Sequence, residues 1–100
     1  MLTPIAVKEF DWDRKEEPER IQKTFQFKSR DGALHFLYKL IEFEDQFGHH
    51  AAILLSEDRI TVQVRTKRLD RVTDLDIEYA QAANEIAKDV SYIKEERLYG

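Results

Sequence analysis

Polar and apolar residues alternate at two places in the chain, and each alternation predicts a β-strand. Over residues 21–27 the apolar side chains hold one phase of a period-2 pattern and the polar ones hold the other, with Lys23 as the exception. Residues 60–64 repeat the pattern. Such alternation is typical of a strand with one face in the core and one in solvent. An apolar run at residues 51–55 predicts a hairpin partner for the second strand.

The turn of this hairpin fixes how its two strands pair. With the turn centred at residues 57–58, opposed residue numbers sum to 115, so Leu55 faces Ile60 and Ile53 faces Val62. A slip of one residue would set every apolar side chain against a polar one. The pattern therefore predicts one register for the hairpin.

Two further segments carry apolar residues at helical spacing. The first has a candidate N-cap at Ser29 or Asp31 and ends at Gly48, which suits the left-handed residue after a helix. The second begins at Thr73, and Asp76 three residues later completes a capping box. We expect this helix to extend to at least residue 88.

These elements predict an α+β fold. Phe10 and Trp12 are the apolar anchors of the first twenty residues, where we expect a short strand or an ordered arm. With that strand the order is β-β-α-β-β-α, and a four-stranded antiparallel sheet with the helices packed on one face buries the apolar stripes. We expect a single domain over residues 1–100, with residues 1–11 as an arm and residues 94–100 as a tail. Leu54 lies in the outward phase of its strand, where it is either covered by a second subunit or exposed alone.

The hairpin register also gathers polar residues of chemical interest at one end. Extending the ladder opposes His50 to Arg65 and His49 to Thr66, which precedes Lys67. Imidazoles titrate near neutral pH and serve as proton donors and acceptors. The sequence therefore predicts a cluster at the end of the hairpin.

A carboxylate can join this cluster from the preceding helix. Asp45 lies four residues before His49 and shares its helical face if the helix persists that far. The alternative is a simple surface pair beside the negative end of a helix. Asp45 and His49 supply two metal ligands where a catalytic zinc uses three, and adjacent histidines on a strand point apart. We therefore predict no metal site.

Composition narrows the function classes. The net charge is −4, and each half of the chain holds 8 basic and 10 acidic residues, which argues against a nucleic-acid binder. The absence of cysteine excludes thiolate chemistry and disulfides. Apolar runs fall far short of the roughly 20 residues of a membrane helix, so we expect a cytoplasmic protein with no membrane contact.

The motifs resemble those of the pterin-4a-carbinolamine dehydratase family. That family's pattern is an acid, three residues, His-His-Pro, a hairpin, a Thr-His strand end and Leu-Thr/Ser-x-x-Asp opening the last helix. Residues 45–51, 64–67 and 72–76 match it in order, and the resemblance covers about residues 12–86.

The resemblance implies dehydration of a 4a-hydroxytetrahydropterin to the quinonoid dihydropterin without metal or organic cofactor. It implies that His49 and His50 are catalytic and that Asp45 matches the acid of the family's site. We expect Asp45, Lys67 and Arg65 to bind the substrate. It also implies a homodimer or homotetramer, and in some members a protein partner.

The sequence departs from the pattern at several positions, among them Ala51 in place of the proline. One departure, Lys67 where the third family histidine is expected, supports an alternative function together with the basic residues around it. Lysine, with a pKa of ~10.4 in water, is a fixed cation at neutral pH. The alternative is a dehydratase-like module that has lost catalysis and uses its basic cluster at residues 65–71 to bind or assemble a protein partner.

Overall fold

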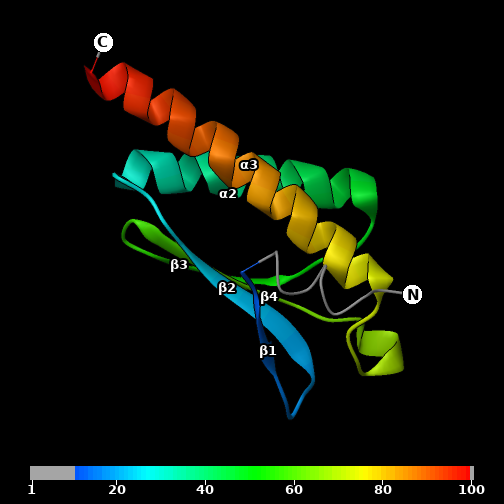
Figure 1. Ribbon diagram of the computed structural model, residues 1–100. Helices are drawn as coiled ribbons and strands as arrows, with labels where there is room; N and C mark the ends of the chain where they lie inside the picture. Colours follow the sequence, from blue (N-terminus) through cyan, green and yellow to red (C-terminus); the bar gives the residue numbers. More distant parts are fainter. Residues whose placement is uncertain (1–10, 100) are drawn as a thin grey trace.

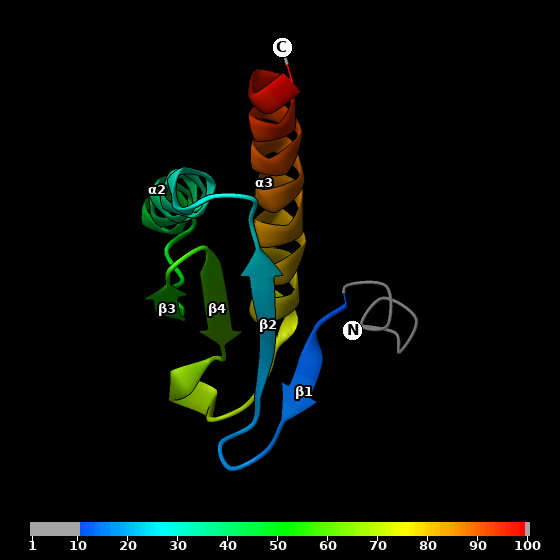
Figure 2. The same cartoon turned by 90° about the vertical axis from the view of Figure 1, so that its left-hand side faces the viewer.

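The computed structural model describes residues 11–99 of the chain, with side chains described for residues 11–90. The elements in chain order are β1 (Asp13–Lys15), β2 (Arg20–Gln26), α2 (Arg30–Phe47), β3 (Ala52–Ser56), β4 (Arg59–Val64), the 3₁₀ helix η1 (Lys67–Leu69) and α3 (Asp74–Tyr99). The strands form one antiparallel sheet in the order β1-β2-β4-β3. Both helices lie on one face of it (Figures 1 and 2), which confirms the predicted α+β fold.

The alternating segments place their apolar phase in the core as predicted. Ile60, Val62 and Val64 of β4 are completely buried, and Phe25 of β2 and Phe27 just after it are nearly so. The face of the sheet opposite the helices carries the polar phase. Burial of this one apolar face is the main favourable term for the fold.

The hairpin has the predicted register. Leu55 pairs with Ile60 and Ile53 pairs with Val62. β3 begins at Ala52, so the two histidines precede the strand and the expected ladder pairs at His49 and His50 are not part of the sheet.

Both ends of α2 are capped as the sequence predicts. The Ser29 side chain accepts a hydrogen bond from the Gly32 N–H at 3.2 Å. Gly48 adopts the left-handed conformation with φ 81°, and its N–H donates to the Glu44 carbonyl at 2.8 Å. Because α2 ends at Phe47, the helical face that was to join Asp45 to His49 is not continued.

α3 begins with half of the predicted capping box. The Asp76 carboxylate accepts the Thr73 N–H at 2.8 Å, while the Thr73 hydroxyl hydrogen bonds to the side chain of Thr66 at 2.6 Å. The helix continues through residues 94–99, which were expected to form a tail. Of the expected arm, residues 1–10 lie outside the described part of the chain, and Trp12 is buried. Neither described helix has an apolar stretch long enough to cross a membrane.

Candidate functional site

A buried carboxylate holds His49. The Nε2 atom of His49 lies 2.6 Å from Oδ1 of Asp76, whose side chain is completely buried in the first turn of α3. The other carboxylate oxygen accepts the Thr66 hydroxyl at 2.8 Å as well as the Thr73 N–H. Three polar groups from three segments thus converge on one carboxylate.

This bond sets which nitrogen of His49 is available. Within the described residues no buried side-chain nitrogen or oxygen lacks a hydrogen-bond partner. Because Asp76 contacts Nε2 of His49, the Nδ1 atom of this partly exposed ring reaches the surface. A carboxylate at one ring nitrogen fixes the tautomer and orientation of an imidazole, and leaves the other nitrogen to exchange protons.

His50 is exposed next to the partly buried His49. With Arg65 and Lys67 it lines a cavity of about 300 Å³, which Glu17, Pro18, Arg20, Ala52 and Gln63 complete. The cavity opens on the face of the sheet away from the helices, because Gln63 alternates with the buried Val62 and Val64. Three of the five predicted site residues therefore line one hollow.

Arg65 and Lys67, two of the cations that line this cavity, differ in how they are held. The Arg65 Nε donates to the Glu19 carbonyl at 3.2 Å, and its guanidinium forms an ion pair with Asp70. Arg65 thus ties the start of β2 to the loop after η1. Lys67 is exposed, so its ammonium group can reach a ligand.

Glu44 is a buried carboxylate that sequence reasoning missed. It is 5% exposed, accepts the Ala51 N–H at 3.1 Å, and receives the hydroxyl hydrogen bond of Tyr79. Burial, together with the Glu44 carboxylate, raises the pKa of Tyr79 above its ordinary value. The available signal was spacing, because Glu44 continues the steps of four from Phe36 and Leu40 on the buried face of α2.

Asp45, the neighbouring carboxylate that was predicted as a site residue, is exposed on α2. The partner of His49 is Asp76. Glu44 and Asp76 therefore fix the short segment of residues 49–51 from two sides, one through a backbone N–H and the other through an imidazole.

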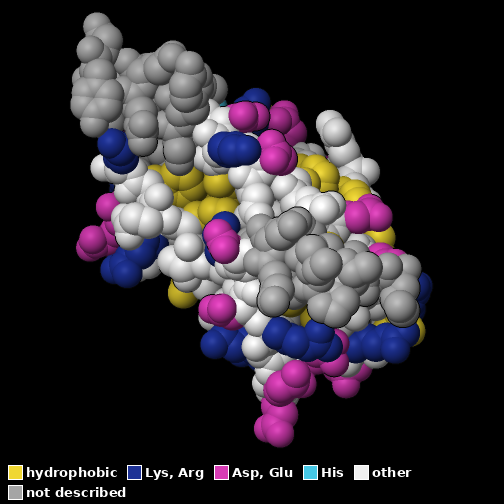
Figure 3. Space-filling model, in the orientation of Figure 1, with side chains coloured by type: hydrophobic (Ala, Val, Ile, Leu, Met, Phe, Trp, Pro, Cys, Tyr) yellow, Lys and Arg dark blue, Asp and Glu magenta, His cyan; other side chains and the backbone are white. Residues whose placement is uncertain are grey.

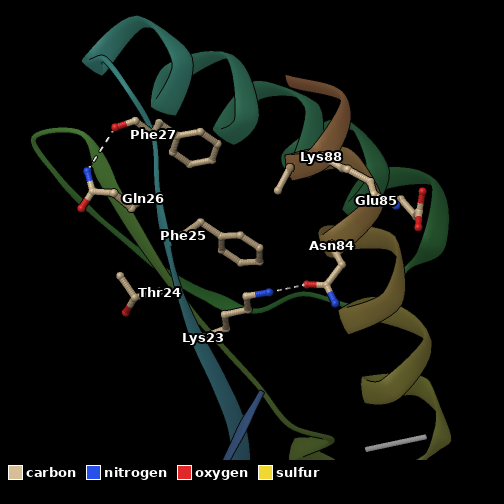
Figure 4. Close-up of a pocket in the computed structure, with 9 residues that line it drawn as sticks. Lys23, Thr24, Phe25, Gln26, Phe27, Asn84, Glu85 and Lys88 are labelled. Carbon is tan, nitrogen blue, oxygen red and sulfur yellow. Dashed lines mark hydrogen bonds between the residues drawn. The ribbon is translucent and has the colours of Figure 1, made fainter. Parts of the chain in front are cut away.

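A second hollow of about 500 Å³ lies between β2 and α3 (Figure 4). The Lys23 ammonium donates to the Asn84 side chain at 3.1 Å and stands 4.9 Å from the centre of the Phe25 ring. None of the predicted site residues lines this groove. In the described part of the chain, no three His, Asp or Glu side chains gather as a metal site would require.

Comparison with known proteins places this geometry in a family. The sequence profile described as pterin 4 alpha carbinolamine dehydratase matches residues 3–86. A curated protein of Thermosynechococcus vestitus, assigned by name only as a pterin-4-alpha-carbinolamine dehydratase, is 32% identical over 73 residues, which are 73% of this chain and 77% of that protein. A relative of the same name from Sulfurisphaera tokodaii is 33% identical over 66 residues, covering 66% of this chain and 71% of the relative.

Solved structures agree. A transcriptional coactivator/pterin dehydratase from Brucella melitensis superimposes with a TM-score of 0.78 and 28% identity, over 86% of this chain and 97% of that one. A pterin dehydratase-like protein, described as a RuBisCO assembly factor in the alpha-carboxysome, shares the fold with a TM-score of 0.68 and 19% identity, over 76% and 88% of the two chains. By its sequence and its fold, this chain belongs to the pterin-4a-carbinolamine dehydratase family.

Proposed function

We propose that the protein dehydrates a 4a-hydroxytetrahydropterin to the quinonoid dihydropterin, and that His49 protonates the departing hydroxyl. The observation that carries this proposal is the 2.6 Å contact between His49 and the buried Asp76, which leaves Nδ1 of His49 at the surface. A buried carboxylate stabilises the imidazolium form and keeps the ring oriented.

The reaction needs two proton transfers. The bond between C4a and the hydroxyl oxygen breaks, and the hydroxyl leaves as water with a proton from the His49 imidazolium. N5 loses its proton as the double bond between C4a and N5 forms. His50, on the cavity side of the same segment, takes that proton. The sum is loss of one water molecule, with no net change in protein protonation once the histidines exchange with solvent.

The predicted substrate-binding residues contribute differently in this proposal. Lys67 contacts polar atoms of the ligand from the cavity wall, and Arg65 shapes that wall through its fixed contacts with Glu19 and Asp70. We propose that Asp45, in the last turn of α2, contacts the ligand. Replacing Asp45 with asparagine tests this contact.

The direct test is to generate a 4a-carbinolamine in the presence of the protein and to follow formation of the quinonoid product. We expect acceleration over buffer, and a loss of roughly 10²–10⁴-fold in His49→Gln, as is usual for a general acid. His35→Gln is the matched control, because His35 is exposed on α2. No acceleration by the wild-type protein, or equal losses in the two variants, would contradict the proposal.

A second function is favoured by the lysine at the third histidine position. In this alternative the chain is a homo-oligomeric binding module of the cytoplasm that holds a protein partner, as the name of the structurally similar RuBisCO assembly factor describes for that protein. The basic cluster from Arg65 to Arg71 would make the contact. Wild-type protein that fails the dehydration assay, but whose salt-dependent association with a partner is weakened by Lys67→Gln with Arg68→Gln, would favour this alternative.

A further inference from the structure

We propose that the cavity beside His50 accepts an anionic group, so that the pterin used by this protein carries a carboxylate or phosphate on its side chain. This inference rests on the proposed function and narrows its substrate class. The described residues that line the cavity include three fixed cations, Arg20, Arg65 and Lys67, against one carboxylate, Glu17. The chain as a whole has a net charge of −4, so the lining of this cavity is positive although the molecule is negative.

Arg20 is held in place without being neutralised by its hydrogen-bond acceptors. Its Nη1 atom donates to two backbone carbonyls of the β1–β2 turn, those of Glu16 at 3.3 Å and Pro18 at 2.8 Å. A guanidinium has five N–H donors, so others are left for a ligand. A cation already fixed by neutral acceptors loses little side-chain entropy when an anion binds.

Lys67 is the second cation of the cavity whose charge is not balanced within the protein, whereas the charge of Arg65 is balanced. The ion pair with Asp70 balances Arg65 locally, whereas Lys67 is exposed. Basic side chains lie at the end of the molecule that carries η1, with acidic side chains beside them (Figure 3). A concave site lined by one sign of charge concentrates ligands of the opposite sign.

The size of the cavity limits the ligand. A volume of about 300 Å³ lies at the small end of the range for small-molecule sites, and is enough for one compact group with part of a ring. With the pterin ring against His50, a short acidic side chain reaches Arg20 and Lys67. Hydrogen bonds to such a charged group are about twice as strong as those to a neutral one.

The test compares three probes that differ in the side chain at C6 of the pterin. These are 6-hydroxymethylpterin, which has a neutral side chain, 6-carboxypterin and the phosphate monoester of 6-hydroxymethylpterin, each titrated against the full chain by pterin fluorescence. We expect at least one acidic probe to bind roughly tenfold more tightly than the neutral one. The more tightly bound acidic probe identifies the group, and its advantage falls as salt is added.

Two variants of the cavity test the residues. Lys67→Gln and Arg20→Gln should each reduce the preference for the acidic probe, whereas Lys39→Gln, an exposed lysine of α2, should keep it. Two cavity variants are used in case one of them misfolds. The unfolding transition of each variant is compared with that of the wild-type protein. Inorganic phosphate should displace the acidic probe more readily than the neutral one.

The outcomes separate this inference from the proposed function. Equal binding of the neutral and acidic probes, with dehydration activity retained, would overturn the anionic substrate and leave the dehydratase standing. Failure of all three pterins to bind, together with absence of dehydration, would overturn both. Loss of preference in Lys39→Gln as large as in Lys67→Gln would also contradict the assignment to this cavity.

Discussion

The first turn and the middle of α3 lie in different environments, and comparing them shows where polar side chains remain accessible to a ligand. In its first turn, Asp76 is buried and fixed by two threonines, yet its third side-chain partner, His49, reaches the surface. In its middle, Asn84 accepts hydrogen bonds from Lys23 and from the Trp12 indole, across a groove beside β2 (Figure 4).

The Lys23 side chain of the groove has its partners within the fold. The Lys23 ammonium contacts an amide oxygen and an aromatic face, both from the protein itself. At the hairpin end, Nδ1 of His49 reaches the surface and the Lys67 side chain is exposed. The volume of a hollow therefore does not by itself identify a functional site here. The larger of the two hollows is the one whose Lys23 has its partners within the protein.

Replacing Asp76 is expected to have the largest effect on stability among the variants that compare these two regions. We expect Asp76→Ala to lower the free energy of unfolding by about 3 kcal/mol, because it strands Thr66, Thr73 and His49 beside a cavity. Urea denaturation measures the loss. Asp89→Ala, at an exposed position of the same helix, should stay within about 0.5 kcal/mol of wild type, and a similar loss in both would contradict the role given to Asp76.

The second largest effect on stability is expected at Tyr79, and it depends on pH. Tyr79→Phe removes a donor from Glu44 and should cost about 1–2 kcal/mol at neutral pH. The pKa of Tyr79 is raised in the folded chain by burial first and by Glu44 second. The stability from this group is therefore complete below the unfolded pKa of about 10 and declines above it, by about 1.4 kcal/mol per pH unit, as the unfolded tyrosine ionises first.

The measurement is the slope of unfolding free energy against pH above about 10. Tyr79→Phe should show a shallower slope than wild type, whereas Tyr38→Phe leaves Tyr79 in place and should keep the slope. Equal slopes in wild type and Tyr79→Phe would show that the raised pKa does not contribute to stability.

A smaller effect compares the two lysines directly. Lys23→Met should lower stability by about 1 kcal/mol, because it removes the hydrogen bond to Asn84 and the contact with the Phe25 ring. Lys67→Met should change stability by less than about 0.5 kcal/mol, since its side chain is exposed. Thermal unfolding of the two variants side by side is sufficient, and the reverse order would overturn the contrast.

The smallest expected change in stability lies on the sheet face away from the helices. Leu54 is 64% exposed there. Leu54→Thr should leave unfolding within about 0.5 kcal/mol, but should weaken self-association if the predicted homo-oligomer covers this side chain. Sedimentation velocity measures the second effect. Leu69→Thr, at an exposed position in η1, serves as the control, and identical sedimentation of both variants would leave Leu54 as an exposed apolar residue.

The hairpin was predictable because local rules sufficed for it. A two-residue turn and period-2 alternation together allow one register, and the observed pairs Leu55–Ile60 and Ile53–Val62 follow from them. The caps at Ser29 and Gly48 were predictable for the same reason. Each depends on residues within a few positions of one another.

The site was predicted only in part because its contacts join distant segments. The partner of His49 lies 27 residues away, and that of Tyr79 lies 35 residues away. Sequence spacing favoured Asp45, whereas packing of α3 against α2 selects Glu44 and Asp76 as the buried carboxylates. Similarly, the ion pair between Arg65 and Asp70 depends on the path of the η1 loop, which alternation does not describe.

The left-handed Gly48 determines how the two histidines leave α2. A Cβ atom built at this position would meet no atom within 4 Å, so the demand for glycine comes from the backbone angle alone. An L-residue there would be strained despite the open space, but its mirror image would not. Chemical synthesis with D-alanine at position 48 should therefore stiffen the junction before His49 while keeping its direction.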